Sequence, residues 1–300
     1  MDAIRTEGLS KHYGRTVALD GLDLSVAPGE VYGYLGPNGS GKTTTIRLLL
    51  GLHRPTSGRA ELFGHDAWAD PVRAHRRVAY VAGEAALWPN LTAAEVLEFL
   101  GNLHGTVDHR YRGELIERFG LDPAKKMRAL SKGNRQKVQL IAALSTHADL
   151  LILDEPSSGL DPLMEVAFRE AATEAKGRGQ GILLSSHILS EVEALCDRIG
   201  ILRDGRLVDE GTLDELRQLH TRTVEATFAG LAPEPAAFAG TGGVAARPAG
   251  AHTMRFEVTG SMAALIAALA RYEVTALTSR EPSLEEVFLH YYRSDPDSPQ

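Results

Sequence analysis

The sequence is poor in the features that mark several special classes of protein. It has one cysteine, Cys196, among 300 residues, so no disulfide can form within the chain, which fits a reducing compartment. Its longest candidate for membrane burial, 262–270, is far below the ~20 residues that a spanning helix needs. Basic residues are not in excess, because the formal net charge is -7. This charge argues against nucleic acid as the main partner, and we expect none.

What is present is the composition of an ordinary globular protein, with 43% hydrophobic and 24% charged residues. From residue 3 to about 220, short strand patterns alternate with helical patterns, as in an α/β sheet covered by helices. The pattern then changes to strand, loop, strand, helix, strand, helix, with the loop in the Ala-, Gly- and Pro-rich stretch 229–251. We therefore expect an α/β domain over 1–221, a small α+β domain over 222–293 and a disordered tail at 294–300.

The stretch GPNGSGKTTT, at 36–45, follows a strand pattern and precedes a helical one. It fits G-x-x-x-x-G-K-[ST], whose backbone N–H groups, with the positive end of the following helix, surround phosphate oxygens. The lysine is expected to reach the β- and γ-phosphates of a nucleotide, the next threonine to ligate Mg²⁺, and the one after it to bind the α-phosphate. The expected nucleotide-binding residues here are Gly36, Pro37, Asn38, Gly39, Ser40, Gly41, Lys42, Thr43 and Thr44.

A second acidic motif supports the same chemistry. The apolar stretch LLIL ends in Asp154 and Glu155. Alone, this pattern would indicate a strand that ends in a solvated acidic turn. Paired with the glycine-rich loop, it predicts that Asp154 holds Mg²⁺ together with Thr43 and that Glu155 polarises the attacking water as a general base.

The stretch LSKGNRQKV, at 130–138, resembles the signature motif LSGGQ of the ATP-binding subunits of ABC transporters, and the likeness covers about residues 3–220. Lys132 and Asn134 replace a glycine and the glutamine, while Ser131 and Gly133 remain. The resemblance implies a P-loop NTPase cassette, with a mixed sheet and a helical subdomain at about 84–148. It also implies that Ser131 and Gly133 contact the γ-phosphate held by a second copy, in a head-to-tail dimer.

Further residues follow the order of that family. SSGLD, ending at Asp161, resembles the D-loop, and His187 resembles the switch histidine that contacts the γ-phosphate. Tyr13 matches the aromatic residue that stacks on adenine, although an aromatic packed at a strand end remains an alternative. One position departs from the family, because Gly83 stands where a glutamine is usual. Either Glu84 substitutes for it, or Mg²⁺ has one fewer protein contact and coupling relies on the loop backbone.

The resemblance implies an ATPase that uses ATP and Mg²⁺ and works with an integral membrane permease subunit at the cytoplasmic face of the membrane. The helical region 92–128 would dock on that subunit, with Trp88, Pro89 and Leu91 either at this surface or in the core. The carboxy-terminal region is similar to that of drug-export subunits of the daunorubicin and bacitracin type, which favours export of a drug, antibiotic or lipid-like substrate.

Two alternatives stay open at this point. One is a soluble ATPase of the same family that acts on ribosomes or nucleic acid; the single cassette, the lack of a heptad array and the acidic balance disfavour it. The other is a regulatory module that binds ATP without hydrolysing it, which the presence of Glu155 and His187 disfavours.

Overall fold

The computed structural model describes residues 1–84, 86–218, 222–280 and 283–293. The expected disordered tail, 294–300, lies outside these residues. The chain forms two compact units, Met1–Glu210 and Gly211–Gln300. The division falls earlier than the expected boundary at 221/222, because helix α8 (Leu213–Gln218) packs against α10 (Leu284–Arg293) of the second unit.

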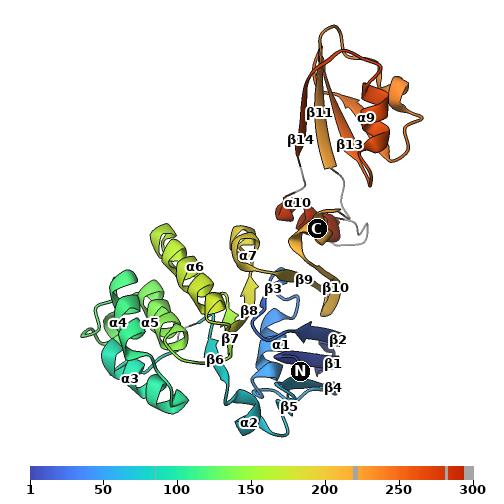
Figure 1. Ribbon diagram of the computed structural model, residues 1–300. Helices are drawn as coiled ribbons and strands as arrows, with labels where there is room; N and C mark the ends of the chain where they lie inside the picture. Colours follow the sequence, from blue (N-terminus) through green and yellow to red (C-terminus); the bar gives the residue numbers. More distant parts are fainter. Residues whose placement is uncertain (85, 219–221, 281–282, 294–300) are drawn as a thin grey trace. The chain divides into compact units, whose positions relative to one another are not determined.

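The centre of the first unit is a six-stranded sheet in the order β10-β9-β3-β8-β7-β6 (Figure 1). Adjacent strands from β9 to β6 in this order pair in parallel. Strands β3, β7 and β8 are buried along their whole length, as their largely apolar sequences predict. The bounds are β3 Val31–Leu35, β6 Val78–Val81, β7 Leu150–Asp154, β8 Gly181–Ser186, β9 Arg198–Arg203 and β10 Arg206–Gly211.

A second, antiparallel sheet has the order β2-β1-β4-β5. Its strands are β1 Ile4–Tyr13, β2 Thr16–Val26, β4 Ser57–Leu62 and β5 His65–Asp66. One hydrophobic core joins this sheet to α1 (Lys42–Leu49) and to residues of the central sheet, with Tyr34 and Ile46 fully buried in it. Helix α1 is therefore fixed between two sheets, which gives the loop before it a rigid base.

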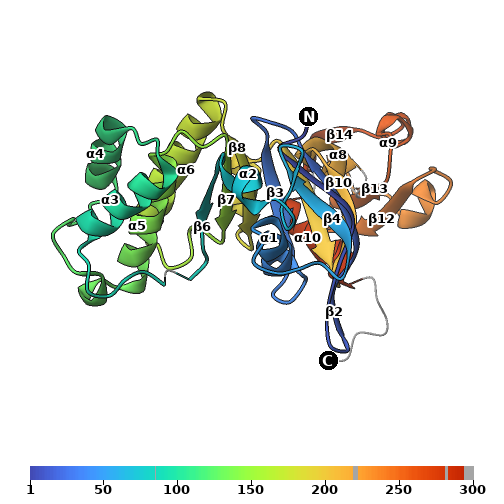
Figure 2. The ribbon, with the colours of Figure 1, turned by 90° about the horizontal axis from the view of Figure 1, so that it is seen from below.

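The remaining helices cover the central sheet and extend to one side of it, where α3, α4 and α5 lie beside one another (Figures 1 and 2). Their core includes Phe119 and Phe168, both fully buried. Helix α3 begins with a capping box, in which the Thr92 side chain and Glu95 each bind the other's backbone N–H. The bounds are α2 Pro71–His75, α3 Ala93–His104, α4 His109–Arg118, α5 Lys132–Leu144, α6 Pro162–Gly177 and α7 Leu189–Leu195, with a 3₁₀ turn, η1, at Met127–Ala129. In the described part of the chain, no helix is long and apolar enough to cross a membrane.

The second unit contains a four-stranded antiparallel sheet in the order β12-β13-β11-β14. One of its faces packs against α9 and a 3₁₀ turn, η2, around the buried rings of Phe238 and Phe256, whose centroids are 4.8 Å apart. The bounds are β11 Arg222–Phe228, η2 Pro235–Phe238, β12 Val244–Pro248, β13 Thr253–Val258, α9 Ala263–Leu269 and β14 Val274–Arg280.

The stretch 229–251 is not all loop, since it contains η2 and β12. Strand β12 is mostly exposed, lies at the edge of the sheet and ends in Pro248, a residue that edge strands tolerate. Its stability comes from pairing along β13, from Val244 opposite Val258 to Pro248 opposite Met254. This partner lies later in the chain, so local composition gave no sign of the strand.

Candidate functional site

The glycine-rich loop connects β3 to α1 at the carboxyl edge of the parallel sheet, where open α/β sheets bind ligands. Gly41 has φ +114°, and a Cβ there would lie 2.7 Å from the carbonyl oxygen of Ala18, so only glycine fits. The carbonyl oxygen of Ser40 accepts a 2.9 Å hydrogen bond from the backbone N–H of Gly205. The loop is therefore held from outside, by the chain around β2 and by the β9–β10 turn.

Lys42 begins α1 and its side chain is buried in this loop. Its Nζ donates to the carbonyl oxygens of Gly36, at 2.5 Å, and Pro37, at 3.2 Å. Burial lowers the pKa of Lys42, and the nearby Glu155 and Asp154 partly oppose this by favouring the ammonium form. A buried ammonium group at a helix amino terminus is a site where phosphate oxygens would bind strongly.

Asp154 ends β7. Strand β8 lies between β7 and β3, the strand that leads into the glycine-rich loop. Asp154 Oδ1 accepts a 2.6 Å hydrogen bond from Ser185 Oγ of β8. Burial raises the pKa of Asp154 above its ordinary value, whereas the hydroxyl groups of Ser185 and Thr43 and the charge of Lys42 lower it. A buried carboxylate beside a threonine hydroxyl fits a divalent cation, which would compensate the charge that burial disfavours.

No group of three or more His, Cys, Asp or Glu side chains in the described residues could hold a metal by itself. A cation at Thr43 and Asp154 would thus need further oxygen ligands from elsewhere. The phosphates of a nucleotide in the glycine-rich loop would supply them, as is usual for Mg²⁺.

Glu155 and His187 lie at the ends of adjacent strands, and Glu155 Oε2 is 3.5 Å from His187 Nδ1. The backbone N–H of Glu155 donates to the carbonyl oxygen of Ser185 at 3.0 Å. Glu155 has φ +47°, in the left-handed region, which costs a non-glycine residue on the order of 1 kcal/mol. The sheet thus fixes the backbone of Glu155 in a strained conformation, which places its side chain beside Asp154 and Lys42.

The residues expected from the signature motif and the D-loop lie at helix starts. Ser131 caps α5, and its Oγ accepts a 3.2 Å hydrogen bond from the N–H of Asn134. Asp161 caps α6 in the same way through the N–H of Met164, at 3.1 Å. In the described part of the chain, no hydrogen bond or ion pair connects Ser131, Gly133 or Asp161 to the glycine-rich loop. Ser131 and Asp161 are exposed, whereas Gly133 is half-buried against the backbone of Gly159.

Tyr13 ends β1 and is 41% exposed. Its hydroxyl lies 3.1 Å from His53 Nδ1, the two rings meet edge to face, and Lys11 Nζ lies 5.0 Å from the centroid of the tyrosine ring. An exposed ring at the rim of the β1–β2 turn is available for stacking on a planar base.

We predict that Tyr13→Ala lowers ATP affinity by about 2- to 10-fold, because a stacked aromatic pair adds ~0.5–1.5 kcal/mol. Tyr13→Phe is the control, since it loses the hydroxyl contact with His53 and keeps the ring. A titration with fluorescent ATP measures both. An equal loss in the two variants would assign the effect to the His53 contact and not to stacking.

Gly83, at the position where the family usually has glutamine, lies directly against Asp154. A Cβ at Gly83 would be 3.2 Å from the carbonyl oxygen of Asp154 and 3.9 Å from its Cγ. The loop after β6 therefore approaches the acidic edge of the site with its backbone.

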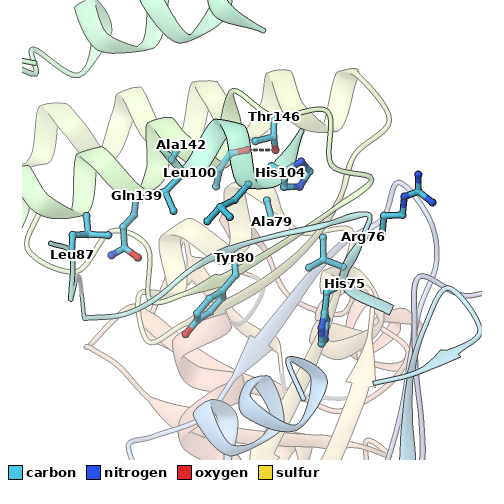
Figure 3. Close-up of a pocket in the computed structure, with 13 residues that line it drawn as sticks. His75, Arg76, Ala79, Tyr80, Leu87, Leu100, His104, Gln139, Ala142 and Thr146 are labelled. Carbon is cyan, nitrogen blue, oxygen red and sulfur yellow. Dashed lines mark hydrogen bonds between the residues drawn. The ribbon is translucent and has the colours of Figure 1, made fainter. Parts of the chain in front are cut away.

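A groove of about 480 Å³ lies between α3, α5 and the strand β6 (Figure 3). Leu87, Leu100 and Leu103 contribute apolar walls, and Figure 3 shows His75, Arg76 and His104 gathered at one end. His104 Nε2 is buried and has no hydrogen-bond partner among the described residues.

An exposed aromatic pair lies in the same part of the chain: Trp88 is 45% exposed and packs edge to face on Phe99, with centroids 4.8 Å apart. Leu91 instead packs against the core of the first unit. Of the residues weighed for a docking surface, Trp88 and Pro89 are thus exposed, and Leu91 is half-buried.

Sequence reasoning missed two sets of residues around the site. Ser185, which binds both Asp154 and Glu155, stands in the visible sequence SSH before His187, and that position was its only signal. Gln136 and Gln139 are buried on α5, where polar residues in a helical pattern gave no sign of burial.

The chain matches two protein families. The family described as ABC transporter matches residues 19–158, and the one described as ATP-binding protein DrrA1-3-like, C-terminal domain, matches residues 211–292. The daunorubicin/doxorubicin resistance ATP-binding protein DrrA of Streptomyces peucetius is 41% identical over 220 residues, 72% of this chain and 67% of that protein. The bacitracin transport ATP-binding protein BcrA of Bacillus licheniformis is 39% identical over 225 residues, 74% of each chain.

Solved structures show the same fold. The structure of an ATP-binding subunit of an ABC transporter has a TM-score of 0.67 and 34% identity, covering 72% of this chain and 92% of that one. A dimeric bacterial ABC transporter cassette has a TM-score of 0.63 and 24% identity, covering 70% and 98%.

A phosphate-binding loop on a parallel sheet, facing an acidic pair on a nearby strand, defines a nucleotide-hydrolysing protein of the P-loop class. The chain belongs to the ATP-binding proteins of the ABC transporter family, and it binds and hydrolyses ATP to power transport. Proteins of this family form dimers and pair with membrane permease subunits. These relatives support transport and give no support to a role on ribosomes or nucleic acid.

Proposed function

We propose that the residues gathered at the carboxyl edge of the sheet bind MgATP and hydrolyse it. The amides of the 36–44 loop and the Lys42 ammonium hold the phosphates, while Thr43 and Asp154 hold Mg²⁺. When bound, this ion would neutralise charge on the phosphate oxygens. Glu155 accepts a proton from the attacking water, and His187, fixed beside Glu155, contacts the γ-phosphate.

The second half of each site comes from another copy of the chain. Ser131 and Asp161 are exposed at helix starts and Gly133 is half-buried, and within the described residues none of the three is hydrogen-bonded to the chain's own loop. A helix amino terminus attracts phosphate, so Ser131 and Gly133 of one copy would complete the γ-phosphate site of the other in a head-to-tail dimer. ATP then lies within the interface, and its hydrolysis weakens the dimer.

The partner is an integral membrane permease subunit, which brings this chain to the cytoplasmic face of the membrane. The groove beside α3 is the surface that supports this proposal, because its walls are apolar. The exposed Trp88–Phe99 pair does not line the groove, but its two residues stand next in sequence to the lining residues Leu87 and Leu100. The end of the groove with His75, Arg76 and His104 is basic. It fits a helix whose apolar face is followed by an acidic or carbonyl group.

Export of a drug or antibiotic is the transport function that the relatives favour. The second unit matches the carboxy-terminal family of DrrA-like proteins over 211–292, and relatives are named for daunorubicin, bacitracin and linearmycin. The observation that carries the whole proposal is the meeting of Lys42, Asp154 and Glu155 beside one phosphate-binding loop.

Copurification tests the partnership. The tagged chain is extracted with its native membranes in mild detergent, and the integral protein that remains bound is identified and reconstituted with it. ATP hydrolysis by the reconstituted complex, and its change with candidate drugs, then reports function. A chain that retains no integral protein under these conditions contradicts the transport role.

Leu103→Asp is expected to reduce capture of the membrane subunit by at least about tenfold while ATP affinity stays unchanged. Leu103 lines the groove and is 70% exposed, so a charge there prevents apolar docking without disturbing the core. Leu231→Asp, at a leucine that is 79% exposed in the second unit, is the matched control. Equal capture of wild type and Leu103→Asp would remove the groove from the proposed interface.

A further inference from the structure

The side-chain amides of two glutamines on α5 form hydrogen bonds with a single residue, Ala82. Gln136 is fully buried, and Gln139 is 9% exposed. Gln139 Oε1 accepts from the backbone N–H of Ala82 at 3.2 Å, and its Nε2 donates to the carbonyl oxygen of Ala82 at 3.4 Å. Gln136 Nε2 donates to the same carbonyl at 3.2 Å, and the two glutamines also bind each other. Both backbone polar groups of Ala82 are therefore held by one helix.

Ala82 is the residue immediately before Gly83, and Gly83 lies against Asp154. The hypothetical Cβ of Gly83 would be 3.2 Å from the Asp154 carbonyl oxygen. Any movement of Ala82 therefore moves the backbone that contacts the acidic edge of the nucleotide site. Because Gly83 has no side chain, the amide groups that fix this loop come from α5.

Helix α5 carries two other sites. Its start is capped by Ser131, which is proposed to contact the nucleotide bound by the second copy. Gln139 itself lines the groove beside α3, where Figure 3 places it on the wall with Leu87 and Ala142. Gln139 thus stands where the groove, the signature helix and the loop beside Asp154 meet.

We propose that Gln139, with Gln136, is a positioning residue that couples the groove and the start of α5 to hydrolysis at Asp154 and Glu155. This rests on the proposed function, in which a membrane subunit occupies the groove and a second copy binds at Ser131. A shift of α5 caused by either partner is transmitted to Ala82 through the hydrogen bonds of the two glutamines. Because they bind both its N–H and its carbonyl oxygen, they fix Ala82 in two directions. Buried amide bonds are directional and break when the helix and the loop move apart, as a coupling contact requires.

The test substitutes the amide without changing its volume much. Gln139→Met keeps an unbranched side chain of similar length and removes the bonds to Ala82, and Gln136→Met removes the second donor. Gln180→Met is the matched control, because Gln180 is also buried and also donates to two carbonyl oxygens, those of Thr146 and Ala148, away from Ala82.

We expect the isolated Gln139→Met subunit to retain ATP affinity within about twofold of wild type. In the reconstituted complex, stimulation of ATPase activity by the membrane subunit should fall by about tenfold, within the usual range of coupling effects, through kcat and not KM. Gln180→Met should retain full stimulation. Retained stimulation in both Gln139→Met and Gln136→Met, or an equal loss in Gln180→Met, would overturn the coupling role.

A second readout does not need the membrane subunit. In the isolated chain, the Hill coefficient for ATP hydrolysis should fall to about 1 in Gln139→Met if α5 links the two nucleotide sites of the dimer, and an unchanged cooperative value would overturn this link. If no integral protein is captured, the transport role fails, while the Hill coefficient still decides the role of the glutamines. The two failures are therefore distinguishable.

Discussion

Glu155→Gln is expected to leave ATP affinity near the wild-type value and to slow turnover by ~10²-fold or more, the usual scale for losing a general base. The amide is nearly the same size as the carboxylate and can keep the contact with His187, but it cannot accept a proton from water. Because Glu155 is held at the end of β7, the substituted side chain should occupy the same place. The loss should thus fall on kcat and not on binding.

The same variant should accumulate as an ATP-bound dimer, since binding continues while hydrolysis is blocked. Size-exclusion chromatography with saturating MgATP measures this, beside a phosphate-release assay for turnover. Glu170→Gln, the same change at an exposed position of α6, is the control and should behave as wild type. Undiminished steady-state turnover in Glu155→Gln would reject the general-base assignment.

Lys42→Ala should instead weaken ATP binding itself, by ~10- to 100-fold, because it removes charge-assisted hydrogen bonds to phosphate from a buried site. The loop also loses the bonds from Lys42 Nζ to the carbonyl oxygens of Gly36 and Pro37, so its closed shape becomes less stable. Equilibrium titration with labelled ATP measures the affinity directly. The main effect should be an increase in the Kd for ATP, and not a change in the turnover of bound ATP.

Lys125→Ala is the control for this prediction. It removes a lysine of the same charge from an exposed ion pair with Asp122, which lies 3.6 Å away, and surface pairs of this kind contribute little. Wild-type ATP affinity is expected there. An unchanged affinity in Lys42→Ala would count against its role at the phosphates.

Much of the site could be predicted because its chemistry is local in sequence. The loop from Gly36 to Thr44 needs a strand before it and a helix after it, and both follow from the periodicity of their neighbours. Asp154 was recognisable because four apolar residues precede it in a fully buried strand. The dipeptide Asp204–Gly205 is also a local turn signal, and both residues adopt the positive φ that closes the β9–β10 hairpin.

The parts that sequence reasoning missed depend on partners far away in the chain. Strand β12 exists because it pairs with β13, and α8 belongs to the second unit because it packs against α10. The sequence gives no sign that Gln139 is buried, since only the folded chain brings Ala82 to it across 57 positions of sequence. Local propensity carries no information about such contacts.

The backbone at Glu155 has a consequence for how this protein could change. Its left-handed conformation suits glycine or asparagine better than glutamate, so a chain selected for heat resistance alone would gain by replacing the residue on which turnover depends. Thermal robustness and catalytic speed therefore compete at one position of the main chain. Selection for function must act there continuously against the simplest route to a more stable fold.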